Sequence, residues 1–223
     1  MNTRGKDLAL ADLLRNHFAK NIQFTKGVDY ARLHWNQTVD PIQSSPVKLD
    51  LDTFIVHAWQ SRYDFATKSK IFPLIKKKIT QSNAKSFLSD FENDANYWRS
   101  IFDTDHLWSS QEKDIARTFD ALNIFKVVQP TPGTLSIVRS YKQGKMSKAQ
   151  CISILKAIEN FHFQFNAVTS SRSSGGISSM YSSFGRQLST ASDRNTATRC
   201  NRGLRQKLKD RKVADSEFDA GFG

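Results

Sequence analysis

Apolar residues recur along most of this chain at steps of three and four, the spacing that places side chains on one face of an α-helix. The clearest stripe follows Ser82 and Asn83, either of which can cap a helix that begins there. Charged residues such as Asp90 and Glu92 fall off this stripe. Its members are Phe87, Leu88, Phe91, Ala95, Trp98, Ile101 and Phe102. The pattern predicts an amphipathic helix with one buried face.

The same spacing predicts several further helices, in some cases with a recognisable start or stop. Ser147 and Gln150 form a Ser-x-x-Gln capping box ahead of an apolar run, and Gly144 ends the segment before it. The other segments are 7–22 with Asp7 as N-cap, one opened by Asp50 or Asp52, 71–79, one starting at Ser109 or Ser110, 135–144, and one from Ile177 to Leu188. The sequence therefore predicts an all-α fold, a bundle-like array of roughly eight to ten helices.

Three stretches lack a clear helical period. Residues 23–49 contain Gly27, Pro41 and Pro46 and are predicted to be a connector with a short helix at 30–35. Residues 161–165 alternate Phe with other residues, so the end of the helix that precedes them is left open. A polar joint of Ser and Gly is predicted at 169–176, and Asp215 is predicted to open a helix that the end of the chain cuts off.

The charge of the chain favours a polyanionic partner. Its 223 residues carry 33 Lys plus Arg against 21 Asp plus Glu, a formal net charge of +12. Such a surface attracts phosphates and gains free energy by releasing their counterions. Cys151 and Cys200 form no metal-ligand pattern, and no apolar run has the length of about 20 residues that crosses a bilayer. We therefore expect a cytoplasmic protein without a membrane partner.

No complete catalytic site can be identified in the sequence. The phosphate-loop, nucleophile-elbow and His-Asn-His patterns are all missing, and the five histidines are scattered. His17 and His162 lie beside apolar faces and are predicted to be core or boundary residues. Asp103, Asp105 and His106 come nearest to a cation site, although an acidic helix end has the same pattern. We predict no catalytic residue and no metal ligand in this chain.

Two regions are candidates for binding phosphate. The first precedes the first helix, where free backbone N–H groups favour an anion, and comprises Asn2, Arg4, Gly5 and Lys6. The second is a basic C-terminal third that can follow a nucleic-acid backbone; its residues are Arg172, Arg186, Arg199, Arg202, Arg205, Lys207, Lys209, Arg211 and Lys212. A solvated cationic helix face has the same composition, and that alternative stays open. Most of the four tryptophans fall on apolar stripes and are expected in the core rather than stacked on bases.

The opening stretch also carries a family resemblance. Residues 2–8, Asn-Thr-Arg-Gly-Lys-Asp-Leu, followed by Ala-Asp-Leu-Leu-Arg-Asn at 11–16, resemble a signature near the end of the nucleotide-binding domain of GmrSD-type modification-dependent restriction endonucleases. Residues 52–59 resemble the Phe-Leu-x-His-x-Trp helix of that family, and 157–163 resemble its Ile-Glu-x-Phe segment. Residues 204–222 are similar to the stretch that leads into the HNH nuclease domain.

The resemblance implies a larger enzyme. Such a protein has a ParB-like domain that hydrolyses a nucleoside triphosphate, a helical middle, and an HNH nuclease that uses a divalent metal and cuts foreign modified DNA. This chain starts after the nucleotide motif and stops before the nuclease histidines, so we expect a fragment without cofactor or activity of its own. Residues 1–22 are the expected remnant of the nucleotide domain, 23–198 a helical connector, and 199–223 a basic lead into the nuclease.

The expected partners are DNA and other copies or domains of the same protein, in a system that defends against phages. The resemblance places Asn2, Arg4 and Gly5 near the nucleotide domain. A second interpretation is an autonomous helical scaffold that binds a protein and whose positive charge only keeps it soluble.

Overall fold

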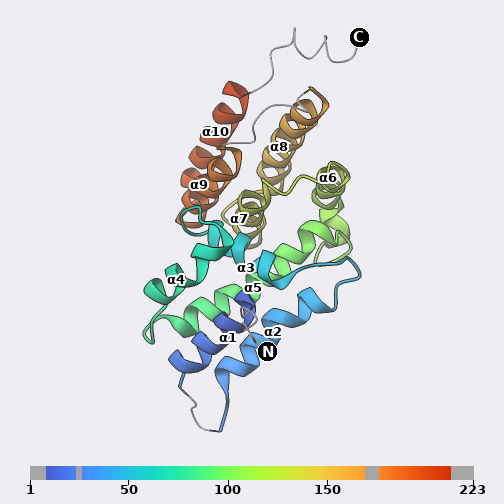
Figure 1. Ribbon diagram of the computed structural model, residues 1–223. Helices are drawn as coiled ribbons and strands as arrows, with labels where there is room; N and C mark the ends of the chain where they lie inside the picture. The colour runs from blue at the N-terminus through green and yellow to red at the C-terminus, as the bar shows by residue number, and fades with distance from the viewer. Residues whose placement is uncertain (1–8, 24–26, 169–175, 212–223) are drawn as a thin grey trace, which may run out of the picture. The chain divides into compact units, whose positions relative to one another are not determined.

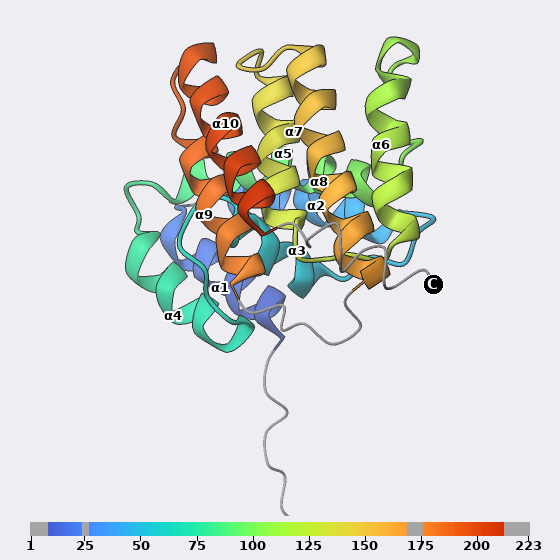
Figure 2. The same ribbon diagram turned by 90° about the horizontal axis from the view of Figure 1, so that it is seen from above.

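A computed structural model describes residues 9–23, 27–168 and 176–211 of the chain, with backbone alone for 165–168. The described part is all-α, as the apolar spacing predicts, with ten α-helices, one 3₁₀ helix and no strand. Figure 1 shows the helices in chain order, and Figure 2 shows them from above.

The chain forms two compact units. Unit 1 is Met1–Ala58 with Ala66–Arg99, and unit 2 is Trp59–Phe65 with Ser100–Gly223. The helices that begin in unit 1 are α1 (Leu10–Asn21), α2 (Tyr30–Gln43), α3 (Leu51–Gln60), α4 (Lys68–Lys78) and α5 (Ala84–Phe102). Those of unit 2 are η1 (Ser110–Glu112), α6 (Lys113–Ile124), α7 (Thr131–Lys142), α8 (Lys148–Val168), α9 (Ile177–Ser189) and α10 (Arg194–Asp210). The expected segments 1–22, 23–198 and 199–223 concern modules of a larger protein and stay a prediction.

Unit 1 is built on a chain of aromatic contacts. The Phe18 ring of α1 lies 6.1 Å from the Trp35 ring of α2 and 5.9 Å from the Phe87 ring of α5. Phe54 of α3 lies 4.6 Å from Phe91 of α5. Each of these side chains is at most 7% exposed. Because aromatic side chains bury large apolar areas, the stripe predicted in α5 provides the surface on which α1, α2 and α3 pack.

Unit 2 is organised around α7 and α9, which pack at unusually close range. Every residue from Thr131 to Ser140 is buried. A Cβ placed on Gly133 would lie 3.1 Å from the Tyr181 side chain, and one on Gly185 would lie 3.0 Å from the Pro132 carbonyl oxygen. Gly133 and Gly185 therefore set the approach of the two helices, because any larger side chain would need space that is already filled.

The buried polar groups of this contact are hydrogen-bonded across unit 2. The Ser136 hydroxyl donates to the Ser61 carbonyl oxygen at 2.9 Å, and the Ser182 hydroxyl donates to that of Gln60 at 2.8 Å. Arg139, which is 3% exposed, donates from Nη2 to the Ser61 hydroxyl at 2.7 Å. These bonds satisfy groups that would be costly to bury alone, and they fix the 59–65 segment on α7 and α9.

Local predictions are confirmed in part. The Ser147 and Gln150 capping box is present, with backbone N–H to side-chain distances of 2.9 and 3.2 Å. The predicted connector at 23–49 is wrong, because α2 runs from Tyr30 to Gln43 and accommodates Pro41 in its last turn. The alternation at 161–165 is helical, since α8 continues to Val168. Asp7, most of the predicted joint at 169–176 and the predicted helix at Asp215 lie outside the described residues.

Candidate nucleic-acid interface

Helix α10 begins at a well-formed N-cap. The Asp193 carboxylate accepts the Thr196 backbone N–H at 2.7 Å, and the hydrogen bonds from Thr196 hold the pKa of Asp193 below its usual value. The face of α10 that packs against α8 and α9 then repeats at steps of three and four. Its buried residues are Ala197, Asn201, Leu204 and Leu208. The apolar spacing thus turns the rest of α10 toward solvent.

The solvent side of α10 is strongly basic. Exposed side chains are those of Arg194, Arg199, Arg202, Arg205 and Lys209, with Arg211 exposed just after the helix, while Lys207 is half-buried. Asp210 is the acidic residue within these bounds, and its carboxylate accepts the side-chain amide of Gln206 at 2.7 Å. Residues three and four apart are neighbours on a helix, so Arg202, Arg205 and Lys209 share one face. We refer to these exposed cations from Arg194 to Arg211 as the α10 basic face.

Arg205 connects this face to the neighbouring helix. Its Nη2 atom donates to the backbone carbonyl oxygen of Ser153 in α8 and to the Ser153 hydroxyl, which lies 2.6 Å away. Two adjoining hollows run between α8 and α10 and share Arg205 as a lining residue. One has a volume of about 240 Å³ and includes Arg202; the other has a volume of about 400 Å³ and includes Lys209. Helix α8 packs against α10, and Figure 1 shows the two helices in gold and red. The surface therefore combines a groove with cations along its wall.

The structure separates the residues predicted to bind nucleic acid. Arg199, Arg202, Arg205, Lys207, Lys209 and Arg211 come together on or next to α10. Arg186 lies on α9, where its Nη1 atom is 3.3 Å from a carboxylate oxygen of Asp64, so part of its charge is neutralised. Arg172 and Lys212 lie outside the described residues, as do Asn2, Arg4, Gly5 and Lys6 of the predicted nucleotide-proximal group.

Sequence reasoning missed the polar residues that line the smaller hollow. These are Ser153, Thr198 and Asn201, together with Gln150, which the sequence assigns only to a capping box. Gln150 serves both purposes, because its amide nitrogen also donates to the Thr198 hydroxyl at 2.8 Å. The feature of the sequence that indicates this hollow is Asn201, a polar residue that interrupts the apolar stripe of Ala197, Leu204 and Leu208.

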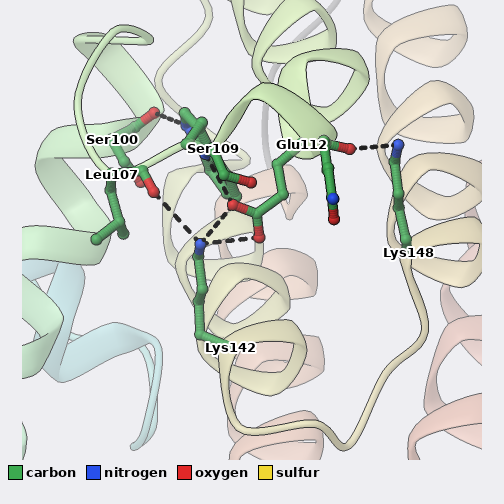
Figure 3. A network of polar contacts seen from close by, with 8 residues as sticks. Ser100, Leu107, Ser109, Glu112, Lys142 and Lys148 are labelled. Carbon is green, nitrogen blue, oxygen red and sulfur yellow. Dashed lines mark hydrogen bonds and ion pairs between the residues drawn. The ribbon is translucent and has the colours of Figure 1, made fainter.

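A second polar cluster, drawn in Figure 3, is structural. Glu112 of η1 accepts the Ser109 backbone N–H at 2.9 Å and the Lys142 ammonium of α7 at 2.9 and 3.0 Å. Lys142 also lies 4.8 Å from the centre of the Trp108 ring, and Lys148 of α8 reaches Asp114 at 3.0 Å. Burial by itself raises the pKa of Glu112, but these donors and Tyr141 outweigh it and lower the pKa to about 2. The ion pairs of this cluster therefore hold η1 and the start of α6 against α7 and α8.

The tryptophans and two of the histidines lie where the apolar spacing predicts. Trp35, Trp59 and Trp98 are at most 5% exposed, and the half-buried Trp108 donates its indole N–H to the Ser100 carbonyl oxygen at 3.0 Å. His17 bonds the Ile79 carbonyl oxygen at 2.8 Å and His162 is 1% exposed, which confirms their boundary and core positions.

Within the described ranges, no group of three or more His, Cys, Asp or Glu side chains is placed to hold a metal ion, and this includes Asp103, Asp105 and His106. No described helix has both the length and the apolar character needed to span a membrane. Comparisons with protein-family models, with curated proteins and with solved structures find no match for this chain.

Proposed function

We propose that this chain is a DNA-binding helical portion of a GmrSD-like, nucleoside-triphosphate-dependent restriction endonuclease that acts against foreign modified DNA. The observation that carries the DNA-binding part is the α10 basic face, where exposed cations accumulate with Asp210 as the acidic residue. The family part rests on the residues at 2–16, 52–59 and 157–163 that resemble that family. Nucleotide hydrolysis and DNA cleavage are assigned to the other domains of such an enzyme and to none of the described residues.

The charge and shape of the α10 basic face support contact with the DNA backbone rather than base readout. Arginine guanidinium groups bind phosphate oxygens through two parallel N–H donors, and such contacts position a protein without reading sequence. Arg205 is held in place by Ser153, so less side-chain freedom is lost when it binds a phosphate. We therefore expect affinity that depends strongly on salt and weakly on sequence.

The test compares two variants that remove the same charge from different places. Arg199, Lys209 and Arg211 are replaced by Gln on or next to α10, whereas the control replaces the exposed Lys20, Lys70 and Lys77 of unit 1. Fluorescence anisotropy with a labelled 20-base-pair duplex is measured between 50 and 200 mM NaCl. Each phosphate contact contributes about 0.9 to the slope of log K against log salt, so we expect the α10 variant to lose up to about 2.7 from that slope. The control variant is expected to keep the wild-type slope.

Equal losses in the two variants would contradict a role for α10, because overall charge would then explain the binding. The second candidate, a scaffold for a protein partner, is favoured by exposed apolar side chains of unit 2 near the end of α6 and on α8. Ile124 is 76% exposed, Val128 57% and Phe163 48%. The Phe163 ring lies 5.8 Å from the ring of Phe125, the residue after Ile124, and exposed apolar side chains that lie close together mark interaction surfaces. A wild-type protein without duplex affinity at either salt concentration would favour this scaffold.

A further inference from the structure

The smaller hollow between α8 and α10 has the donors of a phosphate site. These are Arg202 and Arg205, which line it one turn apart on α10; Ser153 and Thr198 also line it, and their hydroxyls already bond Arg205 and the Arg194 carbonyl oxygen. Among the described residues that line it there is no carboxylate, so an anion entering this hollow meets two arginines and neutral groups. Its volume of about 240 Å³ is slightly below that of pockets for drug-sized ligands, which begin at about 300 Å³. The space therefore suits a phosphate with one attached sugar.

Arg205 is preorganised for such a ligand. Both of its contacts with Ser153 are made through Nη2, and its Nη1 and Nε atoms bond no other described residue. The guanidinium is thus fixed against α8 while most of its donors stay available. Arg202 makes no ion pair within the described ranges. Two such groups, one of them already ordered, bind a phosphate more tightly than mobile surface lysines do.

Asn201 also lines this hollow and carries a buried acceptor. The side chain is 7% exposed, and its Oδ1 atom is buried without a hydrogen-bond partner in the described part of the chain. Its Nδ2 atom faces the Met146 sulfur at 3.9 Å, and a thioether sulfur is only an acceptor, so the orientation of the amide is defined. A buried acceptor without a partner destabilises a fold, and a ligand that supplies a donor removes that penalty.

We propose that this hollow binds one nucleotide unit, with its phosphate on Arg202 and Arg205 and a donor of its sugar or base on Asn201. This inference rests on the proposed function, because it names what the α8 and α10 pair holds when DNA is bound. The shared chemistry is a phosphate monoester with an attached donor. The 5′-phosphorylated end of a DNA strand and a free nucleotide both have this chemistry.

Isothermal titration calorimetry with 2′-deoxyadenosine 5′-monophosphate and with inorganic phosphate tests the assignment. Arg205→Gln is expected to weaken both ligands at least tenfold, and Arg205→Lys is expected to recover only part of the loss. Asn201→Leu is expected to weaken the nucleotide about tenfold while phosphate affinity stays within twofold. Lys77→Gln removes one exposed charge from α4, outside the hollow and the α10 basic face; it is the matched control and is expected to leave both affinities within twofold. Arg205 is exposed, so its variants keep the fold, and thermal unfolding checks Asn201→Leu.

Several results would overturn the inference. One is a wild-type protein that does not saturate with the nucleotide at millimolar concentration. Another is that the Arg205 and Asn201 variants bind both ligands as tightly as Lys77→Gln does. Retained duplex binding with either result would reject the hollow and leave the proposed function standing. Nucleotide binding without duplex affinity would reject the proposed function and support the hollow as a site for free nucleotide. Displacement of the nucleotide by a 5′-phosphorylated oligonucleotide, but not by its unphosphorylated form, identifies the strand end as the ligand.

Discussion

The Asp52 carboxylate of α3 accepts the backbone N–H of Ala11 at the start of α1, with an oxygen to nitrogen distance of 2.8 Å. It also accepts the N–H of Leu10 at 3.3 Å and lies 2.8 Å from the Lys68 ammonium. The N-cap residue Ala9 offers no side-chain acceptor, so a residue 41 positions away caps this helix. Burial by itself raises the pKa of Asp52, but Lys68 and the two N–H groups outweigh it and lower the pKa.

Replacement of Asp52 by Ala is therefore expected to destabilise the protein by about 1–2 kcal/mol, the usual cost of losing an N-cap acceptor. Urea denaturation followed by circular dichroism measures the change. Asp12→Asn, in the first turn of α1 and 46% exposed, is the control and should change stability by less than about 0.5 kcal/mol. Equal effects of the two substitutions would show that Asp52 does not act as the cap.

Replacement by alanine is expected to change stability in opposite directions at two glycines, Gly185 in the close contact of α7 and α9 and Gly203 on α10. Gly185→Ala forces a methyl group to within 3.0 Å of the Pro132 carbonyl oxygen and 3.2 Å of the Ser61 Cα, and backbone atoms cannot easily yield. We expect a loss of about 1–3 kcal/mol. Gly203→Ala on α10 meets nothing within 4 Å and is expected to stabilise the helix by about 0.5–1 kcal/mol. Differential scanning calorimetry would contradict the packing argument if both variants shifted Tm in the same direction.

The low pKa of Glu112 predicts that the protein loses stability at acidic pH. Its pKa in the folded protein is about 2, below the value of about 4.3 expected for an unfolded chain. A depressed pKa of this kind contributes stability that is present above pH 4.3 and is lost as the pH falls toward 2. Glu112→Gln is expected to cost about 1–3 kcal/mol at pH 7, and the difference from wild type should shrink below pH 4. Urea denaturation at pH 7, 4 and 2.5 measures this, and a pH-independent difference would contradict it.

Asp114→Asn is the control for Glu112→Gln. The Asp114 carboxylate also pairs with a lysine, at 3.0 Å from Lys148, but it is 57% exposed. Solvent screens such a pair, so the substitution is expected to change stability little at any pH.

Two histidines, the buried His162 and the half-buried His57, predict a further loss of stability as the pH falls from 7. Burial lowers the pKa of His57 and of His162 from 6.5 to about 4. His57 accepts the Trp98 indole N–H on Nδ1 at 3.2 Å, so protonation there would break that bond. The unfolded chain binds these protons below pH 6.5 and the folded chain does so only near 4, hence unfolding becomes easier in that window.

We expect each histidine to account for about 2–3 kcal/mol of lost stability at pH 4.5. His57→Gln retains an acceptor for Trp98 and should flatten the pH profile between 6.5 and 4.5, as His162→Gln should. An unfolding free energy that is constant over this range in the wild-type protein would contradict both assignments.

Part of the candidate site could be predicted from sequence and part could not. The sequence identifies the arginines and lysines of 199–212, whereas the helix at Arg194–Asp210 and its buried residues Ala197, Leu204 and Leu208 come from the structure. Nothing in the local sequence indicates that Arg186 lies beside Asp64, because these residues are 122 positions apart. The hydrogen bond between Arg205 and Ser153 likewise joins residues that are far apart in the sequence, 52 positions, and no local pattern indicates it.

The sequence by itself determined that this protein is helical, which side of α5 is buried, and where the capping box of α8 begins, because periodicity and caps act between residues a few positions apart. The tertiary structure decided that α2 continues past Tyr30–Trp35, that Asp52 caps α1, and that Asn201 faces a hollow with Arg202 and Arg205. Those outcomes depend on contacts between segments that are distant in the sequence. Such contacts contribute to stability only once the chain has folded and brought the segments together.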